Sequence, residues 1–205
     1  MNTEYKAIKV KPLGGAVGAE IYGVDLNETI SEQQFWEVRQ AFGQYSVIFF
    51  HDQKLTPEKE IRFAERWGEI NINRFFSSVG GYPKIALVVK EPDQKNNIGG
   101  SWHTDHSYEE KPALGSLLYA IEVPADGSGD TWFCDMTAAY DGLSGYMKQR
   151  ISGLRAMHIY NHGHEDFSLS DEQRDILTGY DHPLVRTHPE TGRKALYLGG
   201  KLMKY

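Results

Sequence analysis

The stretch Trp102-His103-Thr104-Asp105, which leads into the apolar run Leu114-Gly-Ser-Leu-Leu-Tyr-Ala-Ile121, indicates both a fold and a chemistry. If the stretch is a strand, the side chains of His103 and Asp105 point to the same face, because side chains alternate along a strand. One metal ion could then bind both. An imidazole and a carboxylate are two members of the two-His-one-carboxylate triad that binds Fe(II). We therefore predict that His103 and Asp105 are metal ligands.

A histidine two positions before a carboxylate is weak evidence alone, so its surroundings must decide. The chain contains two further matches, His164-Glu165-Asp166 and His188-Pro189-Glu190. The first lies in a polar stretch without hydrophobic periodicity, which favours solvated loop residues. The second contains a proline and is followed by Thr-Gly, which is typical of a hairpin turn. The stretch at 102–105 differs because it lies between a glycine-bearing loop and an apolar run.

Composition limits the class of protein. The chain has 205 residues and no linker-like segment, so we expect a single domain over residues 1–205. A net charge of -6 without a basic run argues against nucleic acid as a partner. No apolar run approaches the roughly 20 residues that span a bilayer, and the chain starts without an apolar leader, which predicts a cytoplasmic protein. The single cysteine, Cys134, excludes an internal disulfide and is expected to be a small buried residue.

Helix signals dominate the first part of the chain. Ser31-Glu-Gln-Gln34 has the form of a capping box and predicts a helix over 32–44. Thr56-Pro57 predicts the start of a second helix, which we expect to end at Gly68. Short strands are predicted at 8–12 and 47–50.

Strand signals dominate the rest. Strands are predicted at 84–89, 115–122, 131–133, 154–160, 184–187 and 195–198, a helix at 136–150, and a mobile loop or short surface helix at 161–179. These strands do not alternate with helices, so a parallel βαβ sheet is not expected. The pattern predicts a mainly β fold, an antiparallel barrel or sandwich with helices packed outside.

Motifs along nearly the whole chain occur in the order of one known family. They are Pro12-Leu-Gly-Gly-Ala-Val-Gly-Ala-Glu20, Gly23-Val-Asp-Leu26, Val47-Ile-Phe-Phe50, Trp67-Gly-Glu69, Trp102-His-Thr-Asp105, Gly129-Asp-Thr131 and Arg186-Thr-His-Pro189. In these motifs the chain resembles the TauD/TfdA-like dioxygenases, the family of taurine dioxygenase and chlorophenoxyacetate dioxygenase. The resemblance implies a double-stranded β-helix, the jelly-roll barrel, with flanking helices.

The resemblance also implies a reaction. Members are Fe(II)/2-oxoglutarate-dependent dioxygenases that hydroxylate a carbon next to a heteroatom of a small, often anionic substrate, consume O2 and release succinate and CO2. It implies that His103 and Asp105 are iron ligands and that the Thr131 hydroxyl contacts a carboxylate of 2-oxoglutarate. A homo-oligomer is compatible with this interpretation.

Substrate contacts follow from one departure from the family pattern. The family's sulfonate binders carry a histidine and a tyrosine after the Trp-Gly-Glu segment, where this chain has Asn73 and Phe76. Taurine is therefore not the expected substrate, and Asn73 and Phe76 are candidate substrate-binding residues. Trp102 and His106 alternate away from the two ligands, so we expect Trp102 to pack in the core and His106 to have a structural role.

Two parts of the family's site do not appear before the last residues, Lys204 and Tyr205. These parts are a third ligand, a histidine, and an arginine that pairs with the far carboxylate of 2-oxoglutarate. We expect the sequence to be a fragment with an incomplete jelly roll at its C-terminus; His182 and His188 are the nearest substitutes for the third ligand. Two other functions stay open: a hydrolase or isomerase that uses another metal in the same barrel, and a non-catalytic truncated domain that binds a partner.

Overall fold

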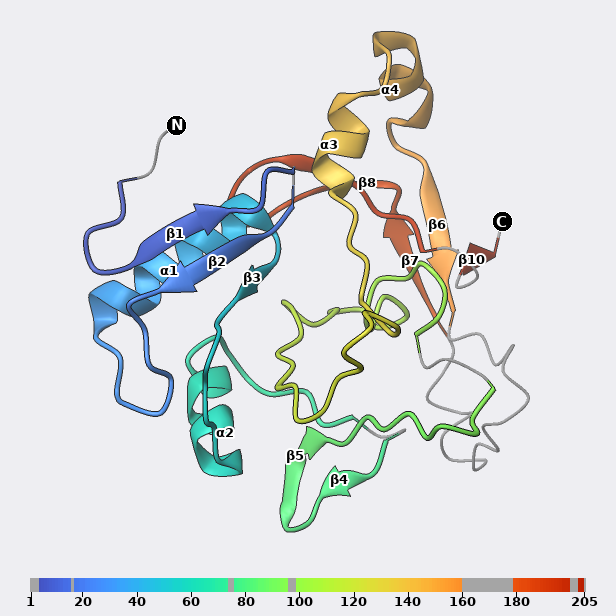
Figure 1. Cartoon of the computed structure of the whole chain (residues 1–205). Coiled ribbons are helices and arrows are strands. Elements are labelled where there is room, and N and C mark those ends of the chain that lie inside the picture. The colour runs from blue at the N-terminus through green and yellow to red at the C-terminus, as the bar shows by residue number, and fades with distance from the viewer. Residues whose placement is uncertain are drawn as a thin grey trace. The chain divides into compact units, whose positions relative to one another are not determined.

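The computed structural model describes residues 4–15, 17–73, 76–95, 99–159, 179–199 and 203–204 (Figure 1). The chain forms two compact units. The first unit comprises Met1–Arg66, Leu118–Gly142 and Thr187–Ala195, and the second unit comprises Trp67–Leu117, Leu143–Arg186 and Leu196–Tyr205. Among the described residues, every buried apolar side chain except Ala156 belongs to the first unit. The main hydrophobic core therefore lies there.

The first unit is built on a small sheet and two helices. Its elements are β1 (Lys9–Pro12), β2 (Ala19–Tyr22), α1 (Glu32–Tyr45), β3 (Ile48–Phe49), α2 (Pro57–Glu65) and α3 (Met136–Asp141). The sheet order is β1-β2-β3, with β1 antiparallel and β3 parallel to β2. α1 packs against β2 and β3 of this sheet (Figure 1). Phe35, Val38 and Ala41 recur at helical spacing on α1 and are buried.

The two predicted helices of the first unit are confirmed. At the start of α1 the Ser31 hydroxyl accepts the Gln34 amide, and the Gln34 side chain accepts the Ser31 amide, so the capping box is formed. In α2, Pro57 occupies the first turn, but the Thr56 side chain makes no capping hydrogen bond. α2 ends at Glu65, before Gly68, and its C-cap is Arg66.

A buried carboxylate ties the start of the chain to α1. Glu37 is 7% exposed and accepts hydrogen bonds from the backbone amides of Lys6, Ala7 and Ile8 at 2.8–3.1 Å. Burial alone would raise the pKa of Glu37, but these amides and the Gln33 side chain outweigh it, so the pKa is lowered. A charged Glu37 therefore serves as the shared acceptor for a segment just before β1.

The second unit is organised around two antiparallel sheets. Its elements are β4 (Ser78–Val79), β5 (Tyr82–Ala86), α4 (Gly145–Ile151), β6 (Arg155–His158), β7 (Tyr180–Pro183) and β10 (Met203–Lys204). β4 pairs with β5, and the other sheet has the order β10-β6-β7. The predicted hairpin near the end of the chain is confirmed as β8 (Val185–Thr187) and β9 (Lys194–Leu196).

Aromatic and imidazole rings form the buried cluster of the second unit. His158 on β6 is 0% exposed, and neither ring nitrogen makes a hydrogen bond of good geometry within the described part of the chain. The His182 ring on β7 lies edge-on to His158 at 5.3 Å between centroids, and Tyr197 stacks on His158 at 4.9 Å. Burial is the main cause that lowers the pKa of both histidines. The charge of His182 also lowers the pKa of His158, and the charge of Arg186 lowers the pKa of both.

Acid should therefore destabilise the second unit. The unfolded chain binds these protons with a pKa near 6.5, whereas the folded chain binds them less tightly. The contribution to stability is complete above about pH 6.5 and is lost as the pH falls below it, because the unfolded state then binds more protons. Urea unfolding at about pH 7.5 and pH 5.5 should show this loss.

His158→Phe keeps a buried ring without a titrating group, so its loss of stability over the same interval should be smaller. His51→Phe changes an exposed histidine and should keep the full pH dependence. If all three proteins lost the same stability between the two pH values, His158 would not be a source of the pH dependence.

Several predicted strands are wrong. Residues 115–122 and 131–133 form no strand, and the stretch around His103 is a loop that enters a turn at Asp105. An apolar pattern indicates a buried face, but a strand also needs a hydrogen-bonded neighbour, and none is present for these segments among the described residues. The helix predicted at 136–150 is two helices, α3 and α4, because Ser144 caps a new helix after Gly142.

Three predictions of burial or class are corrected as well. Trp102 is 58% exposed and does not pack in the core, since the loop around it does not alternate like a strand. Cys134 is exposed. The described residues are a mixture of helix and strand instead of mainly strand: they form four small sheets beside four helices, and no closed barrel is present among them, so the predicted β-barrel fold is supported only in part.

Some predictions lie outside these observations. Residues 160–178, which include His164-Glu165-Asp166, are outside the described residues. The single domain over 1–205 and the incomplete jelly roll stay predictions. Within the described ranges, none of the helices has both the length and the apolar character to cross a membrane.

Candidate metal site

The two predicted metal ligands lie face to face in the second unit. His103 Nε2 is 3.0 Å from Asp105 Oδ1. The backbone brings them together without a strand: it has no regular structure from Trp102 to Thr104 and then turns, with His106 in the left-handed region at φ 54°. The turn is closed by the Ser107 amide to the Thr104 carbonyl and by the Glu109 amide to the His106 carbonyl.

Two further groups orient the pair. The Ser101 carbonyl is 2.7 Å from His103 Nδ1, and because a carbonyl only accepts, Nδ1 carries a proton. The Ser116 hydroxyl donates to Asp105 Oδ2 at 2.6 Å. Nε2 of His103 and Oδ1 of Asp105 therefore face each other, each held from its far side. Sequence reasoning missed both groups; a lone hydroxyl at position 116 inside an apolar run was the available signal for one of them.

The pair is charged without a metal. The Asp105 carboxylate is the main cause that raises the pKa of His103 to about 9, although burial opposes it. In turn, the hydrogen bond from His103 is the main cause that lowers the pKa of Asp105 to about 2, with Ser116 contributing. His103 Nε2 therefore donates to Asp105 in the absence of a metal ion.

The donor pair fits a divalent metal ion. Two ligand atoms that occupy neighbouring positions at about 2.1 Å from a metal lie about 3.0 Å apart. The Nε2 to Oδ1 distance is 3.0 Å, so the two atoms already have the separation that shared coordination needs. Binding of a metal ion would require His103 to lose its Nε2 proton, because a ligating imidazole nitrogen must be deprotonated. Imidazole and carboxylate together suit Fe(II), Mn(II) and Zn(II).

No third protein ligand joins the pair among the described residues, where no group of three or more His, Cys, Asp or Glu could hold a metal. The two nearest substitutes by sequence are engaged elsewhere. His182 Nε2 donates to the Glu109 carbonyl at 2.9 Å. His188 Nδ1 accepts the amides of Glu190 and Thr191 and so stabilises the turn between β8 and β9.

The other predicted site residues have the following surroundings. Thr131 belongs to the first unit and is exposed in the loop after the Gly127–Asp130 turn. Asn73 and Phe76 belong to the second unit and are half-buried, and the Asn73 side chain accepts the Phe76 amide at 3.1 Å. That bond brings the two residues together. The binding roles of these three residues stay predictions.

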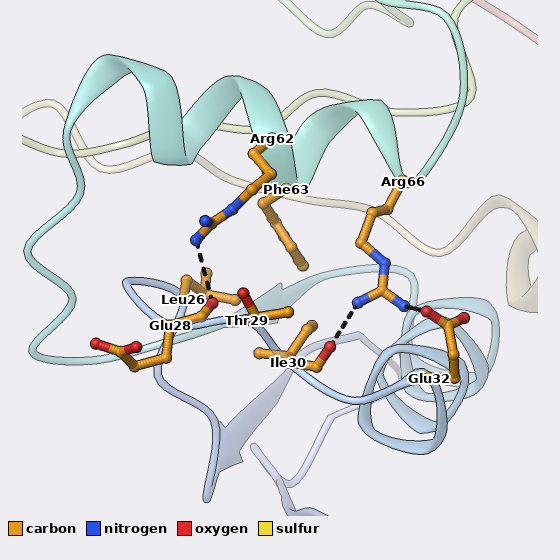
Figure 2. A pocket seen from close by; sticks show the side chains of 8 residues that line it. All are labelled: Leu26, Glu28, Thr29, Ile30, Glu32, Arg62, Phe63 and Arg66. Atoms are coloured by element: carbon orange, nitrogen blue, oxygen red, sulfur yellow. Dashed lines mark hydrogen bonds and ion pairs between the residues drawn. The ribbon is translucent and has the colours of Figure 1, made fainter.

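A cavity of about 230 Å³ lies in the first unit between α2 and the loop before α1 (Figure 2). Arg62 and Arg66 border it, and each donates to backbone carbonyls of that loop, as Figure 2 shows. Arg66 also pairs with Glu32. The cavity contains none of the predicted site residues, and its arginines are used in holding the loop to α2.

Comparison with known proteins decides the family. Residues 9–205 match the family described as taurine catabolism dioxygenase TauD, TfdA family. This chain belongs to the TauD/TfdA family. A TauD/TfdA chain is an enzyme of the α-ketoglutarate-dependent dioxygenase class, so this prediction from the motifs is confirmed.

Individual relatives agree with this assignment. The α-ketoglutarate-dependent 2,4-dichlorophenoxyacetate dioxygenase of Cupriavidus pinatubonensis is 32% identical over 94% of this chain and 74% of its own length. The crystal structure of a putative α-ketoglutarate-dependent taurine dioxygenase from Burkholderia xenovorans is similar with a TM-score of 0.78 at 30% identity, over 96% of this chain and 67% of that one. The structure of AAD-2 in complex with Mn(II) and N-oxalylglycine has a TM-score of 0.67 at 28% identity, over 95% and 70%.

Proposed function

We propose that this TauD/TfdA chain is an Fe(II)- and 2-oxoglutarate-dependent dioxygenase that hydroxylates a carbon next to a heteroatom of a small anionic substrate. The observation that carries the proposal is the His103 and Asp105 pair, with 3.0 Å between Nε2 and Oδ1 and with both groups oriented from behind. Membership of the family supports 2-oxoglutarate as the cosubstrate.

Bound Fe(II) supplies the activation of O2 that acid and base groups cannot provide, while 2-oxoglutarate becomes succinate and CO2. The residues of this chain hold and orient the ion. The Ser101 carbonyl keeps the His103 proton on Nδ1, which leaves Nε2 as the ligand atom. The Ser116 hydroxyl occupies Oδ2 of Asp105, which leaves Oδ1 for the metal and disfavours binding through both oxygens.

The substrate class rests on two observations. The relative from Cupriavidus pinatubonensis is named for 2,4-dichlorophenoxyacetate, an aryl ether carboxylate. In this chain an amide and an aromatic ring, Asn73 and Phe76, stand where the family's sulfonate binders have histidine and tyrosine. An aromatic ring suits an aryl group better than it suits a sulfonate. We therefore propose Asn73 and Phe76 as contacts of an aryl or alkyl ether carboxylate.

Anaerobic titration of the purified chain tests the proposal. Addition of Fe(II) and 2-oxoglutarate should produce the weak visible charge-transfer band of the chelated cosubstrate. Admission of O2 should then yield succinate in the amount of 2-oxoglutarate consumed. No band and no succinate would contradict the proposal, whereas metal-dependent turnover of a substrate without any need for 2-oxoglutarate would favour a hydrolase or isomerase.

Thr131→Val should separate cosubstrate binding from metal binding. The change keeps the shape of the side chain but removes the hydroxyl that we assign to a carboxylate of 2-oxoglutarate. Loss of one hydrogen bond to a charged group, about 1.5–3 kcal/mol, corresponds to a rise of about 10- to 100-fold in the KM for 2-oxoglutarate. Fe(II) affinity should change less than about twofold. An equal loss of both affinities would contradict the assignment.

Thr137→Val is the matched control, because that hydroxyl contacts Asp135 at the start of α3. It should leave the KM for 2-oxoglutarate unchanged.

A cytoplasmic location and a homo-oligomer stay predictions from the sequence.

A further inference from the structure

The loop that carries the metal pair, residues 101–110, needs support from outside itself. We call it the ligand loop. No described strand pairs with it, and two of its internal backbone bonds are the turn contacts from Ser107 to Thr104 at 3.4 Å and from Glu109 to His106 at 3.0 Å. His106 also adopts a left-handed backbone conformation, which is unfavourable for a residue with a Cβ atom. Such a loop keeps one conformation only when neighbouring elements hold it.

Glu109 is the point where the second unit holds the ligand loop. Its carboxylate accepts the Asn71 side chain at 3.2 Å through one oxygen and lies 3.2 Å from His106 Nδ1 through the other. Its backbone carbonyl lies 2.9 Å from Nε2 of His182, a residue 73 positions later in the chain. Because a carbonyl only accepts, the proton of this bond is on Nε2 of His182.

His182 is itself fixed in place. It is 3% exposed and lies on β7, where it pairs with Ala156 of β6. Three rings surround its imidazole, with centroids at 5.3 Å for His158, 4.9 Å for Tyr180 and 5.3 Å for Tyr197. The donor is therefore held by a sheet and by packing, and it cannot follow the loop if the loop moves.

Only a few residues separate Glu109, which His182 contacts, from the metal pair. Asp105 precedes Glu109 by one turn, and Ser107 between them is 0% exposed, so the intervening backbone is packed. The two turn bonds join 104 to 107 and 106 to 109, so they connect Glu109 to the backbone on both sides of Asp105. We infer that His182 is a positioning residue: its bond to the Glu109 carbonyl holds the ligand loop so that Asp105 faces His103. This inference rests on the proposed function for the use of the metal pair.

Three variants test the inference. His182→Phe keeps an aromatic ring in the cluster but removes the donor, whereas His182→Gln places an amide N–H near the position of Nε2. Ala156→Gly is the matched control, because it weakens the paired strand without touching the ligand loop. Hydrogen–deuterium exchange of the 101–110 segment should be about tenfold or more faster in His182→Phe and close to wild type in His182→Gln. In Ala156→Gly, the increase in the exchange rate should be confined to β6 and β7.

Mn(II) affinity, measured from the electron paramagnetic resonance signal of the free ion, gives the second measurement. Loss of a group that orients a ligand typically weakens metal binding 10- to 100-fold, so His182→Phe should bind Mn(II) about tenfold or more weakly, and His182→Gln within about threefold of wild type.

An unchanged exchange rate of residues 101–110 and an unchanged Mn(II) affinity in His182→Phe would overturn the inference. It would also be overturned if Ala156→Gly raised that exchange rate and weakened Mn(II) binding as strongly as His182→Phe. If the wild-type chain binds no Mn(II), the proposed metal site fails, and exchange of the ligand loop alone then decides whether His182 holds it.

Discussion

Replacing His103 by alanine should abolish Fe(II)-dependent formation of succinate, with a fall of about a thousandfold or more, because a metal held by too few ligands is lost or misplaced. The fold should survive. His103 is partly exposed, and its ion pair with Asp105 is worth at most about 1 kcal/mol in such a setting. Turnover with saturating Fe(II) and the midpoint of urea unfolding measure the two effects separately.

His51→Ala is the control for this experiment, since His51 is an exposed histidine of the first unit. It should leave turnover and Mn(II) affinity at wild-type values. Retention of activity in His103→Ala would remove His103 from the site, and a large loss of stability would mean that the residue serves the fold. Partial recovery of Mn(II) binding on addition of imidazole would further support a direct ligand role.

Replacing Glu37 by alanine should destabilise the first unit by about 3 kcal/mol or more. The carboxylate accepts three backbone amides from Lys6, Ala7 and Ile8, and the amide of Ile8 is buried. Removing the shared acceptor leaves donors without a partner away from water, at about 1–3 kcal/mol for each fully buried group. The midpoint of urea unfolding should fall accordingly, and the segment before β1 should exchange its amide protons faster.

The matched control is Glu190→Ala, which removes a surface ion pair with Arg39. Arg39 lies on α1, as Glu37 does. Exposed pairs contribute about 0–1 kcal/mol, so the unfolding midpoint should change little. Similar effects of the two substitutions would show that Glu37 acts only through its charge. Because the pKa of Glu37 is lowered, its contribution is present above the carboxylate's ordinary pKa near 4.5 and is lost as the pH falls below it.

Local signals predicted the parts of this protein that depend on neighbours in sequence. The capping box at Ser31, the proline at the start of α2 and the turn between β8 and β9 were predicted correctly because each is built from side chains within a few residues. The failures came where an apolar pattern lacked a partner. Residues 115–122 have the composition of a strand, yet no described strand pairs with them.

The same contrast applies to the site. The spacing of His103 and Asp105 predicted that their side chains lie together, and the structure has Nε2 and Oδ1 at 3.0 Å although the backbone is a turn and not a strand. Two residues apart, the side chains can meet in either conformation. The predicted strand is therefore wrong, while the role of the two side chains as metal ligands stays a prediction.

The sequence by itself determined the family and the helices of the first unit, because each is encoded in motifs or in spacing along the chain; it also placed His103 and Asp105 close enough to be proposed as metal ligands. The tertiary structure decided which groups support them. Ser116 donates a hydrogen bond to Asp105, and Glu37 accepts hydrogen bonds from the amides before β1. His182 donates to the carbonyl of Glu109, which lies 73 residues earlier in the chain. These contacts join segments that are distant in sequence, and the path of the folded backbone, not local periodicity, sets which distant donor meets which acceptor.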